Sequence, residues 1–226
     1  MALDLSAWTE APWITVRAAP TCPRCFGTLR PPSAWSSAWR CGVHGAVLPF
    51  MSRRPSNEAL DVVRGDSRVP FWLPWPLPAG WLVTGFGDAG EEHSGARAGV
   101  VAVSGPSVTH GPADLVIVAE EPGVGLGAAF AGLDGPDPGP GFDSGPPNVK
   151  VETVGHPTPL WWVEGPSDRA VYVGEAMGSW LWVIGWPSEA GCLVELAQLS
   201  LRDLRDQDQD LDLPYGAFSP RLENEP

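Results

Sequence analysis

Residues 22–44, CPRCFGTLRPPSAWSSAWRCGVH, decide how the N-terminal part of the chain folds. They hold two pairs of metal-binding side chains, Cys22 with Cys25 and Cys41 with His44. Two residues separate the members of each pair, so both can sit on one tight turn and point at a common ion. A hairpin that brings the two turns together completes a tetrahedron, and this spacing is typical of zinc ribbons. The sequence therefore predicts a zinc ribbon over residues 20–50 with these four ligands.

The ligand set also indicates which ion binds and what it does. Three thiolates and one neutral imidazole favour Zn²⁺ over harder cations. Four protein ligands leave no position open for water, so we expect the zinc to be structural rather than catalytic. Gly27 and Gly45 follow the two turns, where the backbone often needs a positive φ. A segment this short cannot bury a core of its own, and we expect it to unfold locally without the ion.

Beyond the ribbon, the chain carries short apolar segments separated by turn residues. Its 226 residues suit the ribbon plus one domain of ~150 residues. The short spacings favour antiparallel connections between strands. We expect strands at residues 81–86, 97–104, 114–120, 149–154, 170–174 and 179–186. The predicted fold class is α+β, in which the ribbon precedes a mainly antiparallel β-sheet domain with few short helices.

The strand expected at 179–186 is apolar on both faces. Every second residue from Trp180 to Trp186 is tryptophan or isoleucine, and Leu181 and Val183 fill the opposite face. Such a strand is expected near the centre of the sheet, covered on both sides. Two helices are also possible, at 123–131 and at 195–206, although the leucine spacing of the second segment fits a strand equally well.

The domain organisation follows from changes in composition. We expect an extension without fixed structure at 1–19, a linker with one short helix at 51–69, and the α+β domain at 70–220. That domain opens with PFWLPWPLPAGW, a strap whose prolines lack the N–H groups that a helix or a central strand needs. Its tryptophans either pack into the core or line a ligand groove: Trp72, Trp75 and Trp81.

Charge is unevenly spread along the chain. Residues 1–70 hold eight arginines against five acidic residues, whereas residues 71–226 hold six basic and 22 acidic residues. The acidic body repels nucleic acids and anionic membranes, so any nucleic-acid contact would come from the ribbon. Asp4, Glu10 and Pro12 interrupt the pattern of a signal peptide. We therefore expect no membrane span and a cytoplasmic protein, whose thiols stay reduced.

A second candidate site is the glycine-rich segment GVGLG, residues 123–127. After a strand it could cradle a phosphate, but its spacing fits neither the dinucleotide-binding nor the P-loop pattern. The preceding Glu120 and Glu121 would also repel a phosphate. As adjacent residues on a strand they point to opposite faces, which favours a solvated strand end over a paired acid and base.

Several longer motifs resemble an uncharacterised protein family of high-GC Gram-positive bacteria. They are CPRC at 22–25, WRCGVHG at 39–45, PFWLPWPLPAGWLVTG at 70–85, LVIVAEEPGVGLGAAFAGLDGPDPGP at 115–140, HPTPLW at 156–161 and GEAMGSWLWVIGWP at 174–187. Members of that family begin a few residues before the CPRC turn. The resemblance implies that residues 1–15 are an over-extended gene start.

The sequence leaves three functions open. The first is a protein-binding or adaptor module with a structural zinc and no enzymatic activity. The second is an enzyme with a nucleotide or acyl-type pocket in the C-terminal domain, near residues 123–127 or the tryptophans. The third is nucleic-acid binding through the basic ribbon, which the acidic body disfavours.

Overall fold

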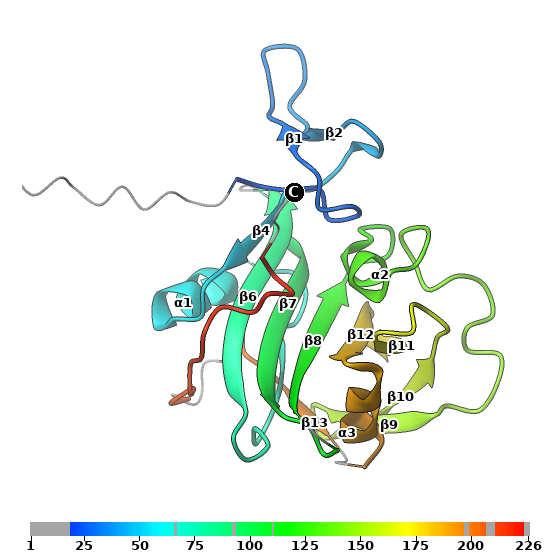
Figure 1. Ribbon diagram of the computed structural model, residues 1–226. Coiled ribbons are helices and arrows are strands. Elements are labelled where there is room, and N and C mark those ends of the chain that lie inside the picture. Colours follow the sequence, from blue (N-terminus) through cyan, green and yellow to red (C-terminus); the bar gives the residue numbers. More distant parts are fainter. Residues whose placement is uncertain are drawn as a thin grey trace, which may run out of the picture.

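The computed structural model describes residues 19–65, 67–91, 94–109, 111–196, 199–206 and 211–223. The extension expected at 1–19 lies outside these residues except for its last one. Two sheets make up the fold (Figure 1). The smaller sheet belongs to the ribbon and has three antiparallel strands: β1 (Leu29–Arg30), β2 (Arg40–Cys41) and β3 (Gly45–Ala46).

The larger sheet has ten strands. In spatial order they are β4 (Phe50–Arg53), β6 (Leu82–Glu91), β7 (Gly95–Pro106), β8 (Pro112–Glu120), β12 (Ser179–Trp186), β11 (Ala170–Ala176), β10 (His156–Trp162), β9 (Val149–Thr153), β13 (Ser200–Asp203) and β5 (Trp72–Pro74). All pairs are antiparallel except β9 with β13. The predicted α+β class with a mainly antiparallel sheet is confirmed.

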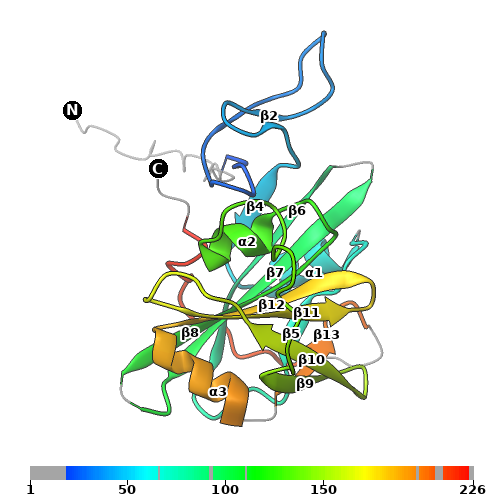
Figure 2. The same cartoon turned by 90° about the vertical axis from the view of Figure 1, so that its right-hand side faces the viewer.

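Within the described residues, three α-helices pack against this sheet: α1 (Asn57–Gly65), α2 (Leu126–Ala131) and α3 (Gly191–Leu196). A 3₁₀ turn, η1 (Ser188–Ala190), precedes α3. In both Figure 1 and Figure 2 the ribbon stands at one end of the molecule, α2 lies beneath it, and α3 lies at the opposite end. No helix in the described ranges is long and apolar enough to cross a bilayer.

The sheet separates two hydrophobic cores. The first lies where β5 packs across β7 and β8, and it buries Trp72 and Trp81 almost completely. Trp75 is half-buried against the same core. Of the two alternatives for the strap tryptophans, Trp72 and Trp81 therefore follow the first and pack into the core. The second core lies on the other face, beneath α2 and the ribbon, and includes Phe50, Phe130 and Trp182.

Strand β12 is central and covered on both faces, as its sequence predicts. Leu181 and Val183 point into the first core, while Trp182 and Ile184 point into the second, and all four are fully buried. It pairs with β8 along one edge and with β11 along the other.

The segment 51–69, expected to be a linker, contributes more to the sheet than a linker would. Phe50–Arg53 pairs with β6 as strand β4. Helix α1 then forms as expected, and the Ser56 hydroxyl accepts the Ala59 N–H at its start. Three of its apolar residues are buried: Ala59, Leu60 and Val63. Strand β4 and helix α1 are therefore part of the body and not a free linker. The division of the chain into separate domains stays a prediction.

Two further strands escape sequence analysis because they contain proline. In β10, Pro157 and Pro159 lie in the part that pairs with β9, while pairing with β11 is confined to Trp161 and Trp162. In the strap, Trp72 and Leu73 keep their N–H groups, so β5 pairs with β13 at the sheet edge, where proline is tolerated. The segment 195–206 resolves into the end of α3 and strand β13.

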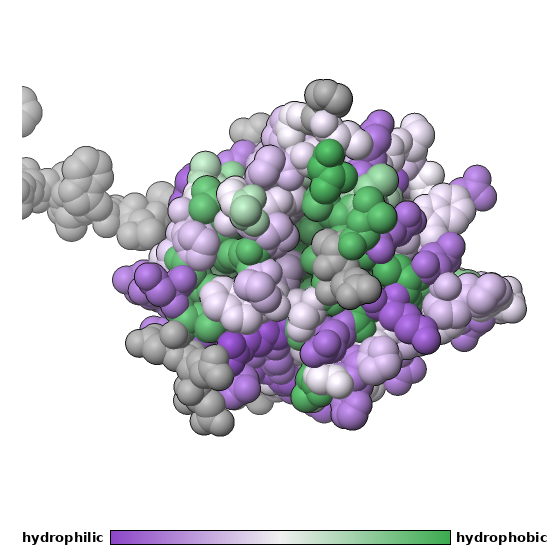
Figure 3. Space-filling model, turned by 90° about the horizontal axis from the view of Figure 1, so that it is seen from below, coloured by the Kyte–Doolittle hydropathy of each residue, from purple (hydrophilic) through white to green (hydrophobic). Residues whose placement is uncertain are grey.

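The end of the molecule opposite the ribbon carries exposed apolar groups. Figure 3 shows hydrophobic side chains near the middle of this face, surrounded by hydrophilic ones. The β7–β8 turn and α3 lie at this end, and they expose Val108 and Leu196. Single exposed apolar residues are common on protein surfaces, so this face carries no functional argument.

Candidate metal centre

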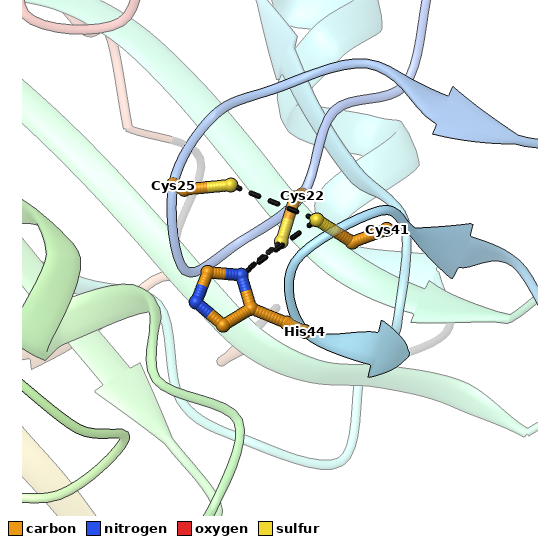
Figure 4. A group of neighbouring side chains, drawn as sticks. All are labelled: Cys22, Cys25, Cys41 and His44. Carbon is orange, nitrogen blue, oxygen red and sulfur yellow. Dashed lines mark hydrogen bonds between the residues drawn. The ribbon is translucent and has the colours of Figure 1, made fainter.

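The four predicted ligands come together at the base of the ribbon (Figure 4). Their ligand atoms all lie within 4.8 Å of one another. Nδ1 of His44 is 3.5 Å from Sγ of Cys22 and 3.7 Å from Sγ of Cys41. The sulfur atoms of Cys25 and Cys41 are 3.7 Å apart. Within the described part of the chain, this is the one group of three or more His, Cys, Asp or Glu side chains that could hold a metal ion.

These distances fit four ligands around one ion. With metal–sulfur bonds of about 2.3 Å and a metal–nitrogen bond of about 2.0 Å, tetrahedral angles separate two sulfurs by about 3.8 Å and a sulfur from a nitrogen by about 3.5 Å. The shortest separations in the cluster match both values. The four side chains could therefore hold an ion with little rearrangement, and they would complete its coordination without water.

Each ligand pair sits on a turn closed by backbone hydrogen bonds. In the first turn the Phe26 N–H donates to the Cys22 carbonyl, and the Cys22 N–H donates to the Gly27 carbonyl. The positive φ expected at Gly27 falls instead on Phe26, at 54°, while Gly45 has the expected positive value of 72°. Both residues directly follow the second ligand of their turn. The strained position at Phe26 is held by the contacts that its ring makes with the body.

Hydrogen bonds and burial act differently on the buried thiols. Burial raises the pKa of the Cys22 thiol to about 12. Burial also acts to raise the pKa of Cys41, but the N–H groups of His44 and Val43 outweigh it and lower that pKa to about 6. The fold itself therefore favours a thiolate at Cys41. Burial destabilises the thiolate form of Cys22. The positive charge of a bound cation would stabilise that thiolate instead.

The ribbon is fixed to the body through residues that lie between and beside its first two ligands. The Arg24 guanidinium donates to the carbonyl oxygens of Gly123, at 2.5 Å, and Val124, at 3.1 Å. The Phe26 ring lies 5.0 Å from the Phe130 ring and 6.0 Å from the Phe50 ring, centroid to centroid. The metal turn is thus attached to the loop before α2, which sequence spacing alone does not indicate.

The glycine-rich segment is not a phosphate site but a platform built around Glu120. Contrary to the expected solvated strand end, Glu120 is fully buried. Its carboxylate accepts the N–H groups of Leu126, at 2.7 Å, and Gly127, at 3.1 Å. These are the N–H groups that a bound phosphate would use. The neighbouring Glu121 is instead paired with Arg97.

A second carboxylate completes the platform. Oδ1 of Asp137 accepts the Gly123 N–H and the Trp180 indole N–H, both at 2.9 Å. Asp137 lies in the loop between α2 and β9, so this contact ties three distant segments together. The sequence does not predict this contact, because a DPGPG loop gives no signal of a partly buried acceptor.

The pKa of Glu120 gives a testable pH dependence. Burial raises this pKa from 4.5 to about 7, against the lowering effect of the N–H groups of Leu126 and Gly127. Between those two values the folded state keeps a proton that the unfolded state releases, so stability falls as the pH rises. We expect the free energy of unfolding to fall by up to about 3 kcal/mol across this window relative to Glu120→Gln. Urea unfolding of both proteins from pH 5 to pH 8 measures it, and a constant difference between them would refute the assignment.

A cleft of about 290 Å³ lies between the ribbon and the body. Arg24 and Ala46 line it from the ribbon, and Glu91, Arg97 and Gly123 line it from the body. Arg24 and Arg97 are both engaged, the first by backbone carbonyls and the second by Glu121. Among the residues that line this cleft, none pairs a nucleophile with a base.

Neither the curated proteins nor the solved structures include a match to this chain. A family model does match, and it spans residues 16–222, which include the metal cluster and both sheets. The chain therefore belongs to a family of unknown function (DUF6758).

Proposed function

We propose that the cluster holds one structural Zn²⁺ and that the protein is a binding or adaptor module whose ribbon contacts a partner protein. The observation that carries this proposal is the closed Cys₃His set at the base of the ribbon. Three sulfurs and one imidazole nitrogen at tetrahedral spacing favour zinc. Because all four positions are taken by protein, such an ion stabilises the fold rather than activating water.

The position of the site supports a binding role. The ribbon is anchored at its base by Arg24 and Phe26, and its far end projects away from the body (Figure 1). That end exposes Trp35 at 96%, and the second metal turn exposes Val43 at 81%. Large apolar side chains held out on a rigid support are typical of protein-binding sites. A cytoplasmic location, in which the thiols stay reduced, belongs to the same proposal.

Partner capture by tagged full-length protein from cells tests this function. Wild type is compared with Cys41→Ser, which removes a ligand, and with Cys192→Ser, a cysteine outside the cluster. We expect a partner to be retained by wild type and Cys192→Ser and lost by Cys41→Ser or after chelation. The purified partner should then bind the purified chain with the same dependence. A partner retained equally well without the ion would rule out a ribbon-mediated contact.

A further inference from the structure

The β1–β2 hairpin of the ribbon carries positive charge on strands that hold no carboxylate of their own. The antiparallel register of β1 and β2 places Arg30 directly opposite Arg40. Both side chains are exposed, and within the described residues neither forms an ion pair. Residues 19–50 contain no Asp or Glu at all. Like charges opposite each other on adjacent strands repel, so this pair lowers the stability of the hairpin.

An ordered turn at the tip of the same hairpin presents an aromatic side chain. Between β1 and β2 the backbone N–H groups of Ser33 and Ser36 donate to each other's carbonyl oxygens, at 2.8 and 3.2 Å. The Ser33 hydroxyl also accepts the Trp35 N–H, at 3.3 Å. The tip is therefore a structured turn, and Trp35 at its apex is 96% exposed. A tryptophan side chain has few rotamers, and here the turn fixes its backbone. Such a residue is well suited to anchor an interface.

We propose that this surface, formed by Arg30, Arg40 and Trp35, binds a short acidic peptide segment of a partner protein. The proposal rests on the proposed function and names the surface and the partner chemistry. Two adjacent guanidinium groups match carboxylates, which accept bidentate hydrogen bonds from arginine. Trp35 would pack against apolar side chains of the peptide that lie next to its acidic residues. A bound acidic segment would also relieve the repulsion between the two arginines.

Charge distribution favours a peptide over a nucleic acid as the occupant. Residues 71–226 carry a net charge of −16, from six basic and 22 acidic residues. A nucleic acid is charged along its whole length, so it would extend from the ribbon over this acidic body and be repelled. A short acidic segment needs to reach only the β1–β2 hairpin.

The probe is a display library of short random-sequence peptides, selected on the intact zinc-loaded chain. Selected peptides should be enriched in Asp and Glu with an adjacent apolar residue. Their affinity should fall about 30-fold in Trp35→Ser and about tenfold in the double variant Arg30→Ser/Arg40→Ser. Two variants serve as matched controls because they alter an exposed tryptophan and an exposed arginine of the body: Trp162→Ser and Arg68→Ser. Both should bind like wild type.

Several outcomes would overturn this assignment. The first two are selected peptides without acidic enrichment and wild-type affinity in both Trp35→Ser and Arg30→Ser/Arg40→Ser. The next two are tighter binding of oligothymidylate than of the peptides, and self-association of the chain that these variants abolish. Loss of the metal from the double variant would also do so, because the arginines would then serve the metal site. If the captured partner still requires the ion but binds Trp35→Ser normally, this surface is wrong and the proposed function stands. If capture is independent of the ion, the proposed function itself fails.

Discussion

Replacing Cys41 with serine is expected to release the metal ion and unfold the ribbon while the ten-stranded sheet stays folded. Cys41 is 7% exposed, and its sulfur lies 3.7 Å from both the Cys25 sulfur and the His44 Nδ1. Structural zinc contributes about 10–16 kcal/mol in small zinc modules, or roughly 3 kcal/mol per ligand. Loss of one ligand should therefore weaken metal binding by a factor on the order of 100.

The reason that unfolding stays local is the distribution of buried residues. The ribbon contributes few side chains to the two cores, chiefly Phe26 and Leu48 at the edge of the second one. The body keeps its own interior without them. Hydrogen exchange measures both regions at once: amides of Phe26 and Val47 should lose protection, and amides of β8 and β12 should keep it.

Cys192→Ser is the matched control for this experiment. Cys192 is half-buried in α3, at the opposite end of the molecule from the ribbon. Its substitution should leave metal content and exchange unchanged. Full protection of the ribbon in Cys41→Ser would mean that the ribbon is held by packing alone.

Replacing Gly127 with alanine is expected to destabilise the protein by about 3 kcal/mol. A Cβ atom at this position would lie 2.2 Å from Cδ1 and 2.3 Å from Nε1 of Trp182. Trp182 is fully buried in the middle of β12 and has no room to move. Alanine favours helices by about 1 kcal/mol over glycine, so the clash has to exceed that gain. Helix α2 would shift, and with it the Glu120 hydrogen bonds and the loop that holds Arg24.

Gly145→Ala controls for the loss of backbone freedom. No atom lies within 4 Å of a Cβ atom built at Gly145, and its φ is not positive. Its stability should change by no more than about 0.5 kcal/mol. Urea unfolding monitored by tryptophan fluorescence compares the two variants with wild type. A Gly127→Ala protein as stable as Gly145→Ala would show that α2 does not pack as described.

How far the sequence predicts this molecule depends on how local each feature is. The four ligands are predictable because two short turns carry them and their spacing encodes a shared ion. Strands β8 and β12 are predictable because their apolar residues are continuous. The prolines conceal β10, since their effect depends on which neighbour a strand pairs with. Only the folded chain shows that Pro157 and Pro159 lie where β10 pairs with β9 and not with β11, so few N–H groups are needed there.

The contacts that mount the ribbon are not predictable from the sequence, because they join distant residues. Arg24 reaches carbonyl groups about 100 positions along the chain, and nothing in its neighbourhood indicates an internal partner. Glu120 is predicted to be solvated because carboxylates are almost never fully buried without partners. Its partners are backbone N–H groups of its own following loop, which a charge pattern does not reveal.

Elemental analysis of purified, reduced full-length protein tests the central claim most directly. One equivalent of zinc per chain is predicted for wild type and Cys192→Ser, and less than stoichiometric zinc for Cys41→Ser. Wild-type protein that carries no stoichiometric metal, or Cys41→Ser that carries as much zinc as wild type, would contradict the assignment of these four side chains as a structural metal site.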